Sequence, residues 1–235
     1  MTCLKKILLT SLILVEGFTT ACAEPARPIV VPQPMVDAPK TAAASNLQTA
    51  AFAGGCFWGV QAVFSHVKGV SEVVSGYAGG DKSTANYELV SEGRTGHAES
   101  VRVRFNPKVV SYGELLRVYF SVAHDPTQLN RQENDIGTQY RSAVFAANAQ
   151  QYEIARKYIE QLNAAKVFSK PIVTQVNALQ AFYPAESYHQ DYLIRNPNNP
   201  YIVANDLPKI NHLKTLFPTL YQENPVKVIS LNSTL

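Results

Sequence analysis

Residues 48–69 read QTAAFAGGCFWGVQAVFSHVKG and place a strand, a turn and a helix in succession. The short run 48–53 predicts a strand that ends at Gly54-Gly55. Apolar residues then recur at helical spacing, at Val60, Val63, Phe64 and Val67. Because two glycines let the backbone turn sharply, we expect Cys56 to lie at the start of this helix.

Further elements follow on both sides of a second helix. Alternating or β-branched patterns predict strands over 70–77, 98–105, 140–146 and 172–176. Ser111 and Glu114 match a capping box that begins the second helix, and Asn148 can cap a third, with Tyr152, Ala155, Ile159 and Leu162 on its inner face. The order β-α-β-β-α-β predicts an α+β fold, a split-βαβ (ferredoxin-like) two-layer sandwich with extra loops and a C-terminal extension. After the last strand we expect loops with short helical pieces near 185–194.

The first 23 residues have the pattern of a secretory signal peptide. Lys5 and Lys6 precede an apolar run over 7–15, and Ala21-Cys22-Ala23 fits a cleavage site. The apolar run is shorter than the roughly 20 residues of a membrane span. We therefore expect export, to a bacterial periplasm. The alternatives are a lipid anchor on Cys22 and an uncleaved amphipathic N-terminus.

The rest of the chain divides into a tether, a domain and a tail. Five prolines and an Ala-rich run over 24–46 predict a flexible tether. Residues 47–222 form the predicted folded domain, and 223–235 form a tail that could add an edge strand or pack on the domain. The composition, 46% hydrophobic and 17% charged, suits one core. The net charge of +3 is too small to indicate a nucleic acid or an anionic membrane as partner.

The predicted mature domain contains a single cysteine. Cys3 and Cys22 lie in the leader, so Cys56 has no partner for an internal disulfide. A free cysteine is often a buried, inert residue. A position at the start of a helix instead favours the thiolate and makes Cys56 a candidate nucleophile.

Six stretches together resemble the signatures of one enzyme family. They are 54–59 (GGCFWG), 86–88 (NYE), 93–99 (GRTGHAE), 124–127 (HDPT), 134–142 (NDIGTQYRS) and 188–193 (YHQDYL). In this order they resemble the A-type methionine sulfoxide reductases, which reduce the S epimer of methionine sulfoxide. The resemblance covers about residues 48–195. It implies a domain that acts on oxidised methionine, free or in proteins, with Cys56 as the nucleophile.

Reduction of a sulfoxide also needs an acid, and Glu99 is the candidate. It shares its strand parity with Val101, Val103 and Phe105, so a regular strand points it toward the apolar face. A carboxyl among apolar neighbours has a raised pKa and can stay protonated, ready to donate to the sulfoxide oxygen. The alternative is a solvent-facing Glu, the more common state of this residue type.

The resemblance assigns the remaining site residues. Tyr87 and Tyr140 would hold the sulfoxide oxygen, and Phe57 and Trp58 would form the apolar wall for the methyl group. Read from the residues alone, both tyrosines could be ordinary half-buried side chains. Asp135 would orient the loop that leads to Tyr140, or simply cap a turn before Gly137. His189 would hydrogen-bond at the rim of the pocket or in the core.

The resemblance also implies a reaction in two halves, with a sulfenic acid on Cys56 between them. Many family members then form a disulfide with cysteines near the C-terminus, but residues 195–235 contain none. The sequence therefore indicates a one-cysteine variant that needs an external thiol, which could be thioredoxin-like, glutaredoxin-like or small. We expect no bound cofactor, no nucleic-acid partner and a monomer.

Two other classes of function remain open from the sequence. Cys56 and His189 could form the pair of a thiol hydrolase if their side chains approach each other. The domain could also be an exported module that binds methionine without chemistry. The five histidines, at 66, 97, 124, 189 and 212, show no metal-ligand spacing.

Overall fold

The computed structural model describes residues 29–40 and 47–228. The predicted leader, two pieces of the predicted tether and the last seven residues of the tail lie outside this part of the chain. No helix within the described residues is long and apolar enough to cross a membrane.

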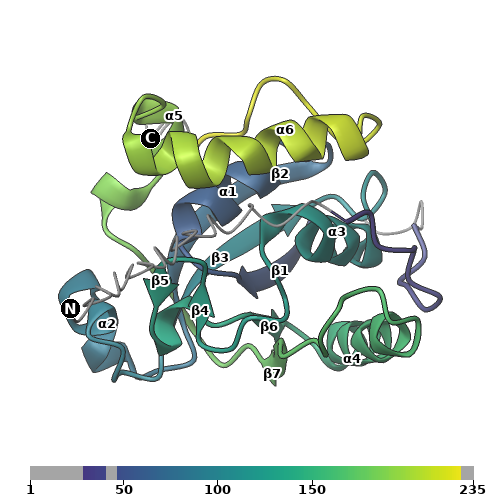
Figure 1. Cartoon of the computed structure of the whole chain (residues 1–235), viewed down its shortest axis with the longest axis horizontal. Helices are drawn as coiled ribbons and strands as arrows, with labels where there is room; N and C mark the ends of the chain where they lie inside the picture. The colour runs from purple at the N-terminus through teal and green to yellow at the C-terminus, as the bar shows by residue number, and fades with distance from the viewer. Residues whose placement is uncertain (1–28, 41–46, 229–235) are drawn as a thin grey trace, which may run out of the picture.

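A six-stranded sheet forms the centre of a mixed α+β fold (Figure 1). Its strands run in the order β7-β6-β1-β3-β2-β8, and every neighbouring pair is antiparallel except β6 with β7. The bounds are β1 (Gln48–Ala53), β2 (Val70–Ala78), β3 (Ala98–Phe105), β6 (Ala143–Ala146), β7 (Gln175–Ala178) and β8 (Phe182–Pro184). A separate two-stranded ribbon pairs β4 (Arg131–Gln132) with β5 (Asp135–Ile136).

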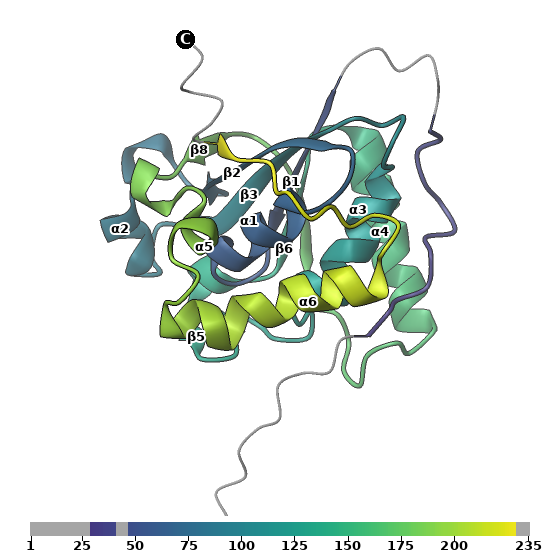
Figure 2. The same ribbon diagram turned by 90° about the horizontal axis from the view of Figure 1, so that it is seen from above.

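Within residues 29–40 and 47–228, six α-helices accompany the sheets. They are α1 (Phe57–Ser65), α2 (Tyr87–Ser91), α3 (Tyr112–Val118), α4 (Ala149–Ala164), α5 (Tyr192–Arg195) and α6 (Leu207–Leu216). Short 3-10 turns occur at Lys82–Thr84, Thr138–Tyr140 and Ser187–His189, and π turns at Tyr119–Ala123 and Ile202–Asp206. Seen from above, α6 runs along the outside of α1 (Figure 2).

One face of the sheet carries the large hydrophobic core. Phe52 of β1 stacks on Phe64 of α1 at 4.9 Å and on Tyr119 at 5.1 Å between ring centroids. Helices α3, α4 and α6 contribute to the same cluster. The opposite face has a smaller cluster of mostly short side chains, namely Ala51, Ala53, Ala78, Ala98, Ala143 and Phe145. This asymmetry fits a sheet with helices on one face.

Several predicted elements agree with the structure. The first strand and the strand over 98–105 have the expected bounds, and the predicted 70–77 strand is one residue longer. The capping box forms, because Ser111 Oγ accepts from the Glu114 N–H and the Glu114 carboxylate accepts from the Ser111 N–H. The Asn148 side chain caps α4 by accepting from the Gln151 N–H.

Other predicted elements differ. The strand predicted from 140 begins at Ala143, because Thr138–Tyr140 form a 3-10 turn, and the strand predicted over 172–176 forms at Gln175–Ala178. Tyr152 is 37% exposed rather than on the inner face of α4. Helix α6 lies in the region expected to hold loops with short helical pieces, and its ten residues form a continuous helix that packs Ile210 and Leu213 into the core.

Residues 29–40 of the predicted tether lie against the domain, which corrects the expectation of a flexible segment there. Val31 is fully buried, and its N–H donates to Ser121 Oγ. Asp37 accepts from the Gly113 N–H at 2.7 Å, and so adds an acceptor at the first turn of α3. Prolines reduce the entropy lost on docking, so this segment behaves as a strap rather than a linker.

The described part of the tail also packs on the domain. The Val226 N–H donates to the Ser65 carbonyl at 3.0 Å, and the Gln222 N–H donates to the His66 carbonyl. Val226 contacts the main core. These bonds place residues 222–226 beside the last turn of α1.

Candidate active site

Cys56 lies where β1 turns into α1, as the sequence predicts. Gly55 has φ +82°, a conformation that favours glycine, and a Cβ there would come within 2.6 Å of the Gln132 side chain. Cys56 is the N-cap residue of α1 and is partly buried. The strand-turn-helix sequence therefore holds the thiol at the edge of the core.

Glu99 of β3 lies beside the first turn of α1 and is only 3% exposed. Its Oε2 accepts from the Phe57 N–H at 3.0 Å. Burial raises the pKa of this carboxyl from its ordinary value of 4.5 to about 8, although the Phe57 N–H opposes the shift. Glu99 is therefore protonated at neutral pH and can donate a proton near Cys56.

The pKa of the Cys56 thiol is raised well above its ordinary value. Burial is the largest cause, and the carboxylates of Glu99 and Asp206 add to it, while the Trp58 N–H acts in the opposite direction. The expectation that the helix start makes Cys56 a thiolate is therefore wrong for the unliganded site. Desolvation, the largest of these effects, outweighs the partial charge of one helix end.

Tyr87 and Tyr140 both lie near the reacting pair. Tyr87 is the first residue of α2, and Tyr140 ends the 3-10 turn before β6. Burial first, and then the charge of Glu99, raise the pKa of each phenol, and the charge of Cys56 contributes to both shifts. Both phenols therefore remain donors over a wide pH range, as a group that holds a sulfoxide oxygen must.

The aromatic residues after Cys56 pack against His189. Phe57 lies 5.0 Å and Tyr87 lies 4.5 Å from the His189 ring, centroid to centroid. Trp58 Nε1 donates to His189 Nδ1 at 3.1 Å, and the Trp58 ring stacks on Tyr192 at 3.7 Å. Among the described residues no hydrogen bond joins Cys56 to His189. The structure therefore does not form the pair that a thiol hydrolase requires.

Asp135 of β5 connects the site to a residue that the sequence analysis missed. Its Oδ2 accepts from the Tyr201 phenol at 2.5 Å. Tyr201 also meets the edge of the Trp58 ring, at 5.9 Å between centroids. The Asp135 side chain is thus positioned by Tyr201 of the C-terminal segment, and not only by the loop that leads to Tyr140. Only the Pro-Tyr pair at 200–201 is visible in the sequence, and it carries no specific signal.

An ion pair with a buried carboxylate lies near Cys56. Asp206 is fully buried and accepts from Lys209 Nζ at 3.1 Å. The pair lies directly against Gly59 of α1, where a Cβ would come within 2.1 Å of Asp206 Oδ1. Burial raises the pKa of Asp206, and the Lys209 ammonium opposes this shift. Sequence reasoning also missed this pair, because nothing near it repeats or matches a motif.

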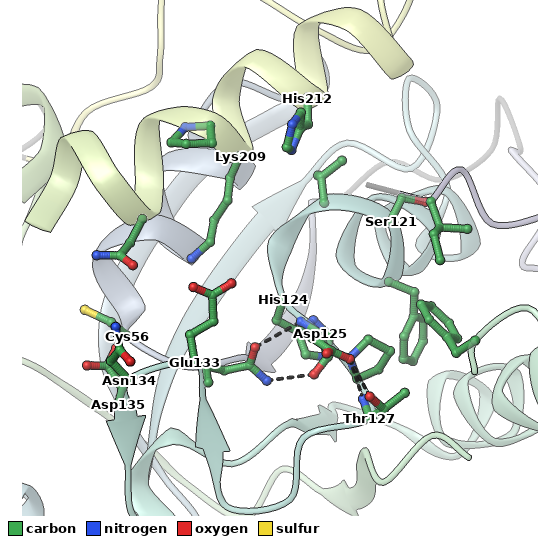
Figure 3. A pocket seen from close by; sticks show the side chains of 18 of the residues that line it. Cys56, Ser121, His124, Asp125, Thr127, Glu133, Asn134, Asp135, Lys209 and His212 are labelled. Atoms are coloured by element: carbon green, nitrogen blue, oxygen red, sulfur yellow. Dashed lines mark hydrogen bonds between the residues drawn. The ribbon is translucent and has the colours of Figure 1, made fainter. Parts of the chain in front are cut away.

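A cavity of about 620 Å³ opens at Cys56 on the side of α6. Figure 3 shows Lys209 and His212 reaching into it from α6, with Glu133 and Asn134 opposite them and Cys56 at one end. Asp135 and Tyr201 also line it, whereas Phe57, Trp58, Tyr87, Glu99 and Tyr140 do not. Within the described residues no group of His, Cys, Asp and Glu could hold a metal ion.

A thiol beside a protonated carboxyl and two phenols defines a thiol-dependent enzyme that donates protons to an oxygen. Comparison with known proteins makes this class specific. The family model for peptide methionine sulfoxide reductase matches residues 48–219. The chain belongs to this family.

Relatives agree over nearly their whole length. The chain is 61% identical to peptide methionine sulfoxide reductase MsrA 2 of Mesorhizobium japonicum, over 81% of this chain and 98% of the relative. It is 52% identical to an MsrA 2 of Synechocystis, over 79% and 87%. Among solved structures, reduced Mxr1 of Saccharomyces cerevisiae matches with TM-score 0.60 and 33% identity, over 66% of this chain and 89% of that one. MsrA of Corynebacterium diphtheriae matches with TM-score 0.57 and 36% identity, over 75% and 87%.

Proposed function

We propose that this enzyme reduces the S epimer of methionine sulfoxide, free or in proteins, to methionine, and so repairs oxidised proteins. The observation that carries the proposal is the buried Glu99, which accepts from the N–H of Phe57, the residue after Cys56, and whose pKa of about 8 keeps it protonated at neutral pH. Membership of the family supports the substrate.

In the first half-reaction Cys56 attacks the sulfoxide sulfur. The sulfoxide oxygen lies between Glu99, Tyr87 and Tyr140, and Glu99 supplies the proton that oxygen needs as its bond to the methionine sulfur weakens. The thiol and the sulfoxide become a sulfenic acid on Cys56 and a thioether, so the methionine sulfur is reduced and the cysteine sulfur oxidised. Phe57 and Trp58 form the wall for the methyl group.

In the second half-reaction an external thiol removes the oxygen as water. Cys56 is the only cysteine among the described residues, and none follows it in the sequence. The candidates are a thioredoxin-like protein, a glutaredoxin-like protein or a small thiol. The protein acts as a monomer without a bound cofactor in this proposal.

The test uses the chain from Glu24 onward with each epimer of a blocked methionine sulfoxide and excess dithiothreitol. We expect methionine from the S epimer only, and none from Cys56→Ser. Tyr152→Phe, which changes an exposed phenol on α4, is the matched control and should keep full activity. A methionine yield that Cys56→Ser leaves unchanged would remove Cys56 from the mechanism. Binding of the sulfoxide without turnover in the unaltered protein would instead support a binding module.

We also infer a split-βαβ plan for the centre of the fold. The strands that the sequence places first to fourth are β1, β2, β3 and β6, and they lie in the order β6-β1-β3-β2. Helix α1 connects β1 to β2, and α3 lies between β3 and β6. The extra strands β7 and β8 extend the two edges.

We further propose export to a bacterial periplasm, on the pattern of Lys5, Lys6, the apolar run 7–15 and Ala21-Cys22-Ala23. A lipid on Cys22 is the alternative. The mass of the mature protein distinguishes them, because cleavage after Ala23 leaves an unmodified Glu24 at the N-terminus and lipidation leaves a modified Cys22.

A further inference from the structure

Cys56 lies at one end of the cavity of about 620 Å³ between α6, the β4–β5 ribbon and the segment 120–127. Glu99, Tyr87 and Tyr140, the residues assigned to the sulfoxide oxygen, do not line this cavity. Of the residues assigned to the site, only Cys56 and Asp135 line this cavity.

The second half-reaction needs a route of its own. The sulfenic oxygen stays beside Glu99, which can protonate it so that it leaves as water. An incoming thiolate attacks the Cys56 sulfur opposite the oxygen that departs, since substitution at sulfur runs in line with the breaking bond. The cavity on the α6 side offers that approach.

The size and lining of the cavity favour a small molecule with polar groups. Its volume lies within the range of about 300–1,000 Å³ typical of small-molecule sites. Asn134 has no hydrogen-bond partner within the described residues, and Asn205 uses only its Nδ2, on the Tyr201 carbonyl. Phe120 and Phe168 supply apolar wall.

The charges around the cavity favour a cation. The carboxyl groups of Asp125, Glu133 and Asp135 line it, and the one ammonium group in the lining, Lys209, is already paired with Asp206. Burial lowers the pKa of His212, so this imidazole is neutral at pH 7. Negative charge therefore predominates, and an anionic thiol would be repelled.

We propose that this cavity admits the thiol that regenerates Cys56, and that the thiol is a small one bearing an amine. The inference rests on the proposed function. One thiol attacks the sulfenic sulfur, forms a mixed disulfide with Cys56 and releases the oxygen as water. A second thiol attacks the sulfur of the bound thiol, which frees Cys56 and leaves the small disulfide as the oxidised product.

The first experiment separates the two half-reactions with Asn205→Trp, which fills the cavity from its wall. Methionine formed in one turnover without reductant measures the first half, and the decay of the Cys56 sulfenic acid with added cysteamine measures the second. We expect an unchanged first half and a second half at least tenfold slower, about 1.4 kcal/mol in barrier. Failure of the first half in the unaltered enzyme would count against the proposed function, not the cavity.

Slowing of both halves by Asn205→Trp would overturn the inference, because the cavity would then receive the substrate. The inference is also overturned if Asn205→Trp leaves the reaction with cysteamine unchanged and slows only the reaction with a protein dithiol. A urea unfolding curve shows whether the variant is folded. Ser169→Trp, at an exposed position in another wall of the cavity, repeats the test should Asn205→Trp not fold.

The second experiment tests the charge preference with thiols of similar size. Cysteamine, 2-mercaptoethanol and 3-mercaptopropionate carry positive, neutral and negative groups, and their rates are compared at equal thiolate concentration. We expect the order cysteamine, mercaptoethanol, mercaptopropionate, and about a threefold smaller spread in Glu133→Gln, the size of effect that a single exposed charge exerts. The matched control Glu153→Gln, on exposed α4, should leave the spread unchanged. No dependence on thiol charge, or equal effects of both variants, would overturn the amine preference.

Discussion

At the scale of single residues, the site depends on two groups that burial makes neutral. Glu99 keeps its proton up to a pH of about 8, and the pKa of Cys56 is raised by burial and by nearby carboxylates. A protonated Glu99 exerts no charge on Cys56, whereas an ionised Glu99 opposes the thiolate. One proton on Glu99 therefore serves both as the acid and as the condition under which Cys56 can ionise.

Activity in the first half-reaction should consequently fall as pH rises through about 8. Ionisation of Glu99 removes the proton donor and adds a negative charge beside Cys56. Glu99→Gln should lower the single-turnover rate about 100-fold, the usual contribution of a general acid, and should abolish this decline. The pH profile of the first half-reaction is obtained by measuring methionine formation between pH 6 and 10. This interval spans about two units either side of the Glu99 pKa. A decline that persists in Glu99→Gln would assign it to another group.

The same pKa makes a prediction about stability. A carboxyl whose pKa is raised on folding binds its proton more tightly in the native state, so it costs stability as pH rises from its ordinary value of 4.5 to about 8. Relative to Glu99→Gln, the unaltered protein should lose up to about 1.4 kcal/mol per pH unit across this window. Urea unfolding of both proteins at several pH values measures the difference. Parallel stability curves would contradict it.

At the scale of secondary structure, α1 holds the site because its first turn packs closely on the segment before α6. Gly59 allows this approach, since its missing Cβ leaves room for the Asp206–Lys209 pair. Asp206 is fully buried, and its negative charge raises the pKa of Cys56. The C-terminal helix thereby acts on the thiol through a contact at the helix start.

Gly59→Ala should destabilise the protein by about 1–3 kcal/mol, the usual cost of overpacking. The new methyl group would force Asp206 away, because the space at Gly59 is closed. Asp206→Ala in the same chain should recover part of the loss, so the two changes should be less than additive. Unfolding free energies of the two single variants and the double variant test this. If the losses of unfolding free energy are strictly additive, the side chains at positions 59 and 206 are not in steric conflict.

At the scale of the whole molecule, segments far apart in the sequence meet around β1. The strap over 29–40 crosses α3 and α4, and the Arg117 guanidinium donates to the Val31 carbonyl. The described tail contacts the last turn of α1 from the other end of the chain. Residues 29–40 and 222–226 therefore stabilise the helices that surround the core.

A chain that begins at Thr41 should be less stable than the chain from Glu24 by about 2 kcal/mol or more. The shorter chain loses the buried Val31 side chain, worth about 1.5–3 kcal/mol, and the Asp37 acceptor at α3. The midpoint of urea unfolding measures this. Equal midpoints for the two chains would show that the strap adds nothing to stability.

Much of the fold and half of the site could be predicted from local pattern. Strand alternation, glycine turns and caps are short-range signals, so β1, β2, β3, α1, α3 and α4 follow from neighbouring residues. Glu99 was found because strand parity links it to Val101 and Val103. Tyr87 and Tyr140 came from resemblance, because an isolated tyrosine has no local pattern that separates function from packing.

The sequence by itself indicated the family, the place of Cys56 at the start of α1, the burial of Glu99 and the bounds of β1 and β3. The tertiary structure alone decided the bond from Tyr201 to Asp135, the Asp206–Lys209 pair against Gly59, the docking of 29–40 and the direction of the Cys56 pKa. The physical reason is range. Propensity and periodicity act between neighbours in the chain, whereas desolvation and charge act between any groups that the fold brings together.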